Sequence, residues 1–135
     1  MHKWIVIFSF FILGFVKGID PHDFYLSIME LDEVIILDVR LWEDYASDRI
    51  INSIWAGEMS ELEKVVENID KNRSIFLYCD YDDRSSVVSK ILKKKGFKRI
   101  FKLEGGLMDW KNMGFPVDTI TFADSLKYNA TFNER

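Results

Sequence analysis

The stretch VIILDVR at residues 34–40 decides the fold class, because it is a nearly continuous run of β-branched and aliphatic residues. Such a run is typical of a strand that is buried on both faces of a parallel sheet. The stretch SIFLYC at residues 74–79 repeats this pattern. Because helical patterns separate these strands, the sequence predicts an α/β domain in which helices flank a central, mostly parallel sheet.

The segments between the strands carry signals for the starts and ends of helices. Asp20-Pro21 is typical of an N-cap residue followed by proline in the first helical turn. Residues 59–70 place apolar side chains at helical spacing, and residues 85–96 form an amphipathic pattern that ends in lysines and a glycine. We find no repeat and no internal linker, so the chain is predicted to hold one domain.

Composition excludes several classes of protein. The 135 residues are 48% hydrophobic and 30% charged, which fits a globular domain with its own core. The formal net charge of −4 argues against a nucleic-acid partner, because proteins that bind nucleic acids normally present a basic face. One cysteine and two histidines offer no metal constellation, so we expect no metal and no other cofactor.

The first 18 residues, MHKWIVIFSFFILGFVKG, differ from the rest of the chain. A basic start followed by an apolar run is typical of a secretory signal peptide, and Gly18 offers a cleavage position. The sequence therefore predicts an exported protein, periplasmic or secreted, with its domain at residues 19–118 and an unassigned tail at 119–135. The alternative is an uncleaved anchor, which is the only membrane contact that we expect.

The only cysteine, Cys79, lies where a ligand site is expected. It ends one buried strand and precedes the helix at residues 85–96, and ligands of parallel sheets bind at the carboxyl ends of strands, beside helix N-termini. Inward-pointing N–H groups in such a turn, together with the helix dipole, favour a thiolate. The alternative is an inert buried thiol. The position between strand and helix favours a nucleophile.

Four segments of the chain follow one another in the order of a known family. They are ILDVR at 36–40, EDYASDRIINSIW at 43–55, CDYDDRS at 79–85 and LEGGLMDWKNMGFPV at 103–117. The third is similar to the loop C-x-x-G-x-R-S, and the fourth to the ending L-x-G-G-x-x-x-W-x-x-x-G-x-P-V. Together they resemble the rhodanese-like family of single-domain sulfurtransferases over nearly the whole of residues 20–117.

The resemblance implies a rhodanese-like three-layer domain that carries sulfane sulfur as a persulfide on Cys79. The sulfur would come from a small donor such as thiosulfate, or from a protein persulfide, and pass to a thiol or cyanide. Arg40 is expected to face the substrate. The loop residues expected to surround the sulfur are Asp80, Tyr81, Asp82, Asp83, Arg84 and Ser85.

Loop length and two side chains refine this hypothesis. Four residues separate Cys79 from Arg84, one fewer than in the C-x5-R loop of cysteine phosphatases, and this favours sulfur transfer over phosphate chemistry. Arg84 either organises the loop, through an ion pair with a carboxylate such as Asp38, or binds the substrate. Ser85 either donates to the sulfur or caps the following helix.

Acidic residues set this loop apart from the family pattern. Asp82 stands at the usual glycine and would be strained if that position required a positive φ. Three aspartates face one arginine, so dianionic thiosulfate should be repelled and turned over weakly, and replacing Asp80 and Asp83 should raise that turnover at low salt. The acidic loop also keeps two other functions open: an inactive binding module and, less favoured, a redox-active thiol protein.

Overall fold

Five strands form the centre of the molecule. The computed structural model describes residues 14–119, and its strands lie in the order β1-β5-β4-β2-β3, with every neighbouring pair parallel. The strands are β1 (Phe15–Ile19), β2 (Ile35–Asp38), β3 (Ile54–Trp55), β4 (Ser74–Tyr78) and β5 (Arg99–Leu103). The helices are α2 (Pro21–Glu30), α3 (Trp42–Ser47), α4 (Met59–Val66), α5 (Asp83–Lys94) and α6 (Gly106–Asn112).

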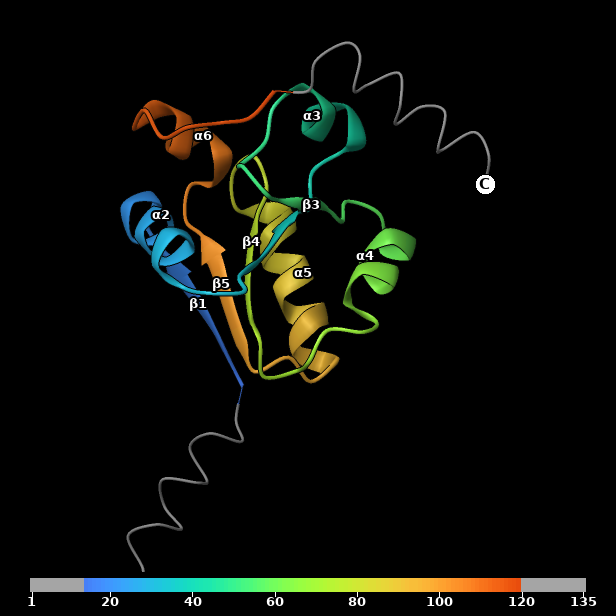
Figure 1. The fold of residues 1–135 in the computed structure, drawn as a ribbon. Helices are drawn as coiled ribbons and strands as arrows, with labels where there is room; N and C mark the ends of the chain where they lie inside the picture. Colours follow the sequence, from blue (N-terminus) through green and yellow to red (C-terminus); the bar gives the residue numbers. More distant parts are fainter. Residues whose placement is uncertain (1–13, 120–135) are drawn as a thin grey trace, which may run out of the picture.

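Helices cover both faces of the sheet, with α2 and α6 on one side and α4 and α5 on the other (Figure 1). Side chains alternate along each strand, so Ile36 and Phe76 pack with Trp110 of α6, whereas Leu37 and Ile75 pack toward α4 and α5. Burial on both faces explains why β2 and β4 are almost entirely apolar. The predicted three-layer α/β fold is therefore confirmed.

The helix ends agree with the local signals in the sequence. The Asp20 carboxylate accepts a hydrogen bond from the Asp23 N–H at 2.9 Å, and α2 begins at Pro21. α5 begins at Asp83, slightly earlier than predicted, and Gly96 beyond its end has φ 96°, a left-handed conformation that glycine adopts without strain. Local capping chemistry thus accounts for the start of α2 and the end of α5, whereas no side chain in the described part of the chain caps the start of α5.

The N-terminal boundary of the domain differs from the predicted one. The predicted leader ends at Gly18, but β1 spans Phe15–Ile19 and pairs with β5 along its whole length. The Phe15 ring packs edge-on against Phe101, with ring centroids 5.5 Å apart. The sheet therefore begins four residues before the expected boundary. Residues 1–13 of the predicted leader, and residues 120–135 of the unassigned tail, lie outside the described residues.

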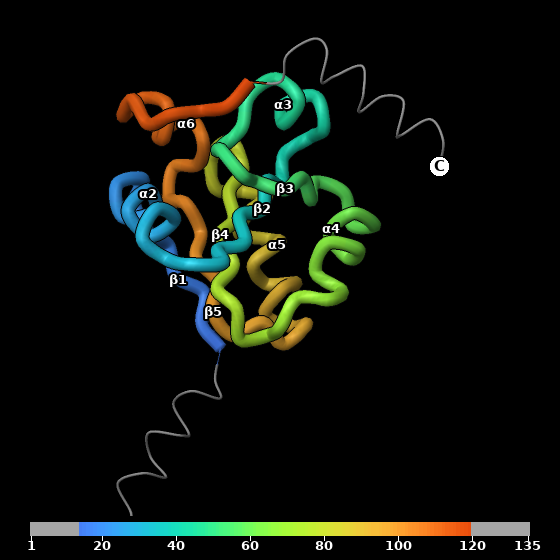
Figure 2. The backbone as a smooth tube through the Cα atoms, in the orientation of Figure 1, coloured from blue at the N-terminus to red at the C-terminus, as the bar shows by residue number. Residues whose placement is uncertain are grey.

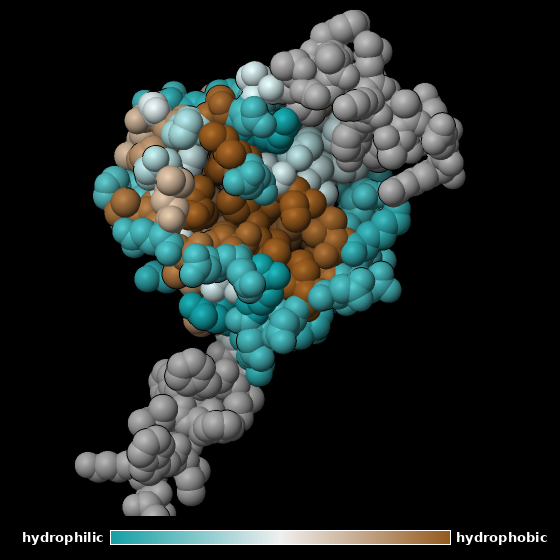
Figure 3. Space-filling view, viewed as in Figure 1, coloured by the Kyte–Doolittle hydropathy of each residue, from teal (hydrophilic) through white to brown (hydrophobic). Residues whose placement is uncertain are grey.

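The surface combines hydrophilic and apolar side chains. Figure 3 shows apolar side chains across the middle of one face, with hydrophilic side chains around them. Within residues 14–119, no helix has the length and apolar character needed to cross a bilayer.

The carboxyl ends of the central strands meet at one end of the sheet, where α3 and α6 lie (Figure 2). An ion pair between Lys111 of α6 and Asp48, just after α3, joins these two helices. The loops that follow β2 and β4 emerge between them. This end of the molecule therefore brings together Arg40, Cys79 and the acidic loop.

Candidate active site

Cys79 lies at the carboxyl end of β4, directly before the loop that leads into α5. Its Sγ accepts a hydrogen bond from the Ser85 N–H at 3.4 Å and lies 3.5 Å from the Ser85 hydroxyl oxygen. Because the first N–H groups of a helix have no partner within the helix, the Ser85 N–H is free to bind the sulfur. Only 3% of the Cys79 surface is exposed. The sulfur is therefore held at the base of the loop, with little contact to solvent.

Ser85 has two contacts at once. Its hydroxyl donates to the main-chain oxygen of Asp82 at 3.1 Å, while its oxygen and its N–H both lie beside the Cys79 sulfur. Of the two alternatives for this residue, the structure shows the partner of the sulfur and not the cap: the N-cap residue of α5 is Asp82, and Ser85 lies inside the first turn. The loop N–H groups of residues 80–84 are also expected to donate hydrogen bonds to the sulfur. In the described structure none of them does so.

The start of α6 fixes the main chain of the loop. The Leu107 N–H donates to the Cys79 oxygen at 2.8 Å, and the Met108 N–H donates to the Asp80 oxygen at 3.1 Å. A Cβ atom on Gly106 would lie 2.3 Å from the Tyr81 oxygen, and this glycine has φ 63°. The close approach of two backbones explains the second glycine of the LEGG segment.

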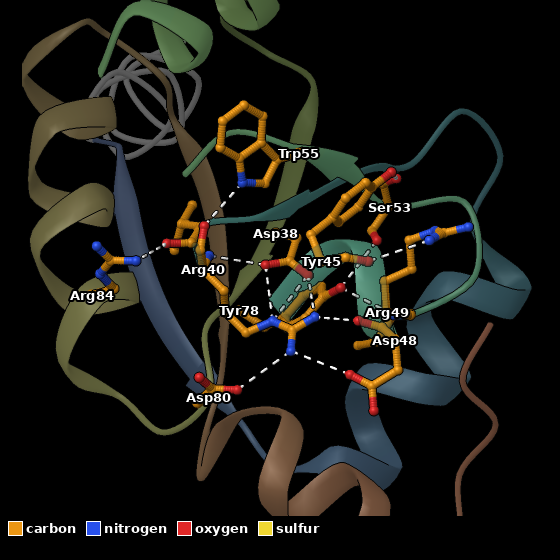
Figure 4. Close-up of polar contacts among 12 residues, drawn as sticks. Asp38, Arg40, Tyr45, Asp48, Arg49, Ser53, Trp55, Tyr78, Asp80 and Arg84 are labelled. Carbon is orange, nitrogen blue, oxygen red and sulfur yellow. Dashed lines mark hydrogen bonds and ion pairs between the residues drawn. The ribbon is translucent and has the colours of Figure 1, made fainter. Parts of the chain in front are cut away.

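Arg40 lies behind the loop rather than facing a substrate, which corrects the sequence prediction. Its side chain is 3% exposed, and its Nε and Nη2 atoms bind both oxygens of the fully buried Asp38 at 2.8–3.1 Å. Its Nη1 atom lies 3.4 Å from both Asp48 and Asp80 (Figure 4). Three carboxylates thus surround this guanidinium. The pairing with Asp38 is the one that burial requires, because a buried carboxylate needs a cation.

Burial shifts the ionisation of this cluster. Burial raises the pKa of the Asp38 carboxyl, although hydrogen bonds and charge from Arg40 act in the opposite direction. Burial alone would lower the pKa of Arg40, but the hydrogen bonds and charge of Asp38 outweigh it, so the pKa rises and the guanidinium stays charged. Arg40 is therefore a permanent cation behind the loop.

The three loop aspartates point in different directions. Asp80 is bound to Arg40, as described above. The Asp82 carboxylate accepts from the Gly105 N–H at 3.2 and 3.3 Å and lies 3.9 Å from the Lys102 ammonium. Asp82 has φ −133°, so the position of the usual glycine requires no left-handed backbone. Asp83 alone forms no ion pair with any residue of the range 14–119.

Arg84 and Tyr81 lie on the outer side of the loop. The Arg84 guanidinium donates to the Val39 oxygen at 3.5 Å and forms no ion pair within the described part of the chain. Tyr81 is 62% exposed. Asp83 and Arg84 border a cavity of about 310 Å³ between α4 and α5, whose other lining residues are Val39, Ala56, Gly57, Met59, Leu62, Val87, Val88 and Ile91.

The sequence did not single out several residues that complete this site. Asp48, Lys102, Gly105 and Lys111 contact Arg40 or the acidic loop, or join the two helices above them. Their shared signal is position, because each lies at or just beyond the end of a strand, or on or directly after a helix that covers this end of the sheet. A rule based on position would have found them, whereas residue type alone does not.

One cluster in residues 14–119 has the spacing of metal ligands. It consists of Asp20, His22 and Asp23, which are exposed at the start of α2. The Asp20 carboxylate already caps this helix. These residues lie on a different element from the cysteine loop and have no bearing on it.

The fold and site define a three-layer α/β domain with a single cysteine at the end of a central strand. A family model described as a rhodanese-like domain matches residues 21–113, and the chain therefore belongs to the rhodanese-like family. A protein of Coxiella burnetii, named thiosulfate sulfurtransferase GlpE, is 32% identical over 85 residues, which cover 63% of this chain and 78% of that protein.

Two further comparisons agree with this assignment. A protein of Allochromatium vinosum, named sulfurtransferase, is 24% identical over 102 residues, which cover 76% of this chain and 94% of that protein. The crystal structure of the Alr3790 protein from Anabaena sp. has a TM-score of 0.71 and 26% identity, and it covers 87% of this chain and 94% of that chain. Sequence and structure therefore support the same family.

Proposed function

We propose that this protein is a sulfurtransferase that carries sulfane sulfur as a persulfide on Cys79. The observation that carries the proposal is the position of this sulfur, at the carboxyl end of β4 and hydrogen-bonded by the Ser85 N–H at the start of α5. The helix start adds a partial positive charge, which favours an anionic sulfur. Family membership and the names of the relatives support sulfur transfer as the chemistry.

The reaction follows from the thiolate as nucleophile. The Cys79 thiolate attacks the outer sulfur of thiosulfate, the bond between the two sulfur atoms of thiosulfate breaks, and its electron pair leaves with sulfite. The enzyme then holds a persulfide anion. Cyanide or a thiolate attacks the terminal sulfur, and the pair of the persulfide bond returns to Cys79, which releases thiocyanate or a new persulfide.

The charge around the loop supports a small anionic donor better than the sequence alone does. Asp80 and Asp82 are bound by Arg40 and Lys102, so Asp83 is the one loop carboxylate without an ion pair in residues 14–119. Arg84 offsets this charge at the same border. We therefore propose thiosulfate, another small sulfane donor or a protein persulfide as the donor, and a thiol or cyanide as the acceptor. Export to the periplasm or the medium remains a prediction from the leader.

One observation favours a second function, a binding module without turnover. Cys79 is only 3% exposed, so a donor has little direct access to the sulfur. A rhodanese-like domain with a shielded thiol would bind a partner without accepting sulfur from it. Sulfur transfer requires that a small donor enter the loop.

Mass spectrometry of the intact protein separates these two functions. We expect one added sulfur atom after incubation with thiosulfate or an inorganic polysulfide, and loss of that sulfur after cyanide treatment. The variant Cys79→Ser should gain no sulfur, and it keeps a side chain of similar size. A wild-type protein that takes sulfur from neither donor would contradict the enzyme and favour the binding module.

A further inference from the structure

We infer that Asp80 and Asp82 are positioning residues, which tie the cysteine loop to the ends of the two strands on either side of it. The role of these two residues in sulfur transfer rests on the proposed function, whereas their role in holding the loop does not. These roles replace the view, drawn from the sequence, that the loop aspartates form a uniform negative rim. Two of the three acidic side chains hold the loop, and the third, Asp83, forms no ion pair within residues 14–119.

The geometry follows from the order of the strands. β4 lies between β2 and β5, so the loop after β4 has the end of one strand on each side. Asp80 reaches Arg40, just after β2, at 3.4 Å. Asp82 reaches the Gly105 N–H, just after β5, at 3.2 Å, and Lys102 within β5 at 3.9 Å. The two aspartates, two residues apart, therefore hold the loop from opposite sides.

These side-chain contacts add to the main-chain contacts from α6. N–H groups at the start of α6 donate to the main-chain oxygens of Cys79 and Asp80. The main-chain oxygen of Asp82 instead accepts from the Ser85 hydroxyl and the Ser86 N–H, both in α5. The Asp82 carboxylate supplies the missing connection between this part of the loop and β5. Asp82 binds Gly105 through its carboxylate and Ser85 through its main-chain oxygen. Loss of the first contact is therefore expected to move Ser85 and its N–H away from the sulfur.

The charge of each positioning residue is balanced where it lies. Arg40 is buried and stays charged, and the Lys102 side chain is only 19% exposed. The Arg40–Asp80 and Gly105–Asp82 contacts are charge-assisted hydrogen bonds, which are stronger than neutral ones, whereas the Lys102 ammonium at 3.9 Å from Asp82 adds only its charge. Asp83 pairs with no cation in the described part of the chain, so we infer that its charge acts on solvent and on ligands. The three acidic residues therefore have two distinct roles, although they look alike in the sequence.

The test compares Asp80→Ala, Asp82→Ala and Asp83→Ala, which each remove one loop charge. Cys79 is alkylated with iodoacetamide, a neutral reagent whose reaction does not depend on sulfur transfer. We expect about fivefold faster alkylation in the first two variants, because local opening exposes the buried sulfur, and the wild-type rate in Asp83→Ala. Alkylation that is equally fast in all three variants, or unchanged in all three, would overturn the inference.

Dilute urea distinguishes loop opening from a general loss of stability. A local opening exposes little surface, so the alkylation rate of Asp80→Ala and Asp82→Ala should not change between 0 and roughly 1 M urea. A rate that climbs steeply with urea would mean that the whole domain unfolds and would contradict a positioning role. Asp82→Asn, which keeps an acceptor for the Gly105 N–H, should restore most of the slow alkylation.

Sulfur loading by intact mass then links positioning to the reaction. We expect about tenfold slower loading in Asp80→Ala and Asp82→Ala with thiosulfate and with a polysulfide alike, because the sulfur loses its alignment. Asp83→Ala should load faster with thiosulfate at low salt and show no gain at high salt. A wild-type protein that accepts no sulfur defeats the proposed function alone, whereas the alkylation series still decides the positioning role.

Discussion

Arg40 determines more of the site than any other single side chain. It lies between β2, α3 and the cysteine loop, and it binds carboxylates from all three. Asp38 has no exposure at all, so its charge depends chiefly on this partner, with a smaller contribution from a hydrogen bond with Tyr78. The role of the Arg40 guanidinium is therefore structural, because it joins three segments of the chain and does not face a ligand.

Removing the charge of Arg40 should destabilise the domain strongly. Arg40→Met keeps the aliphatic stem but leaves Asp38 buried without a cation, which costs roughly 3–5 kcal/mol in the free energy of unfolding. Lys64→Met is the matched control, because the Lys64–Glu61 pair is exposed and contributes about 0–1 kcal/mol. Urea unfolding of both variants measures the difference. Equal losses would contradict a central role for Arg40.

Tyr78 predicts a pH dependence of stability. Burial, and next the Asp38 carboxylate, raise the pKa of Tyr78 well above its ordinary value of about 10. Its hydroxyl binds Ile50 N–H and Ser53 at 3.0 Å each. Above pH 10 the unfolded chain loses this proton while the folded protein retains it. The stability that Tyr78 contributes is thus complete below pH 10 and is lost as the pH rises further.

The variant Tyr78→Phe tests this expectation. At pH 7 it should cost roughly 1–3 kcal/mol, because the Ile50 N–H is left buried without an acceptor. Between pH 10 and 11 the advantage of the wild type over the variant should shrink by about 1 kcal/mol, because the unfolded tyrosine is already half ionised at pH 10. Urea unfolding of both proteins at pH 7, 10 and 11 measures it. A constant difference would mean that Tyr78 titrates alike in both states.

At the scale of elements, β1 connects the predicted leader with the folded domain. Its side chains at Phe15 and Val16 are exposed, yet its backbone pairs with β5. An exposed apolar pair next to an apolar run looks like a continuation of that run. The side-chain pattern therefore predicts that residues 15–18 belong to the leader, because the role of β1 rests on backbone pairing, which leaves no pattern in the side chains.

Two truncated forms test the contribution of β1. A protein that starts at Gly14 keeps the strand, whereas one that starts at Ile19 loses four of its five residues. We expect the shorter form to lose roughly 3 kcal/mol in the free energy of unfolding, from lost backbone hydrogen bonds and the Phe15–Phe101 contact. Thermal and urea unfolding compare the two. Equal stability would mean that β1 is dispensable and that the domain begins at residue 19.

At the scale of the whole molecule, the sequence predicted the architecture better than the directions of charged side chains. The segments that form β2 and β4 are almost entirely apolar, so their composition alone predicts that they are buried. The placement of Cys79 at a strand end follows from a parallel α/β fold, whereas the strand order does not, because many strand orders are compatible with the same alternation of strands and helices. The partners of Asp80 and Asp82 do not follow from it either, because they come from distant segments and depend on how each carboxylate turns.

The contacts between α6 and the cysteine loop have a consequence for protein synthesis. α6 is the last described helix in chain order, so a ribosome releases Cys79 and its neighbours well before the N–H groups that hold them. Until α6 emerges, the main chain around Cys79 lacks these hydrogen bonds, and we expect its thiol to be open to oxidants. Formation of the sulfur centre is thus coupled to the synthesis of α6.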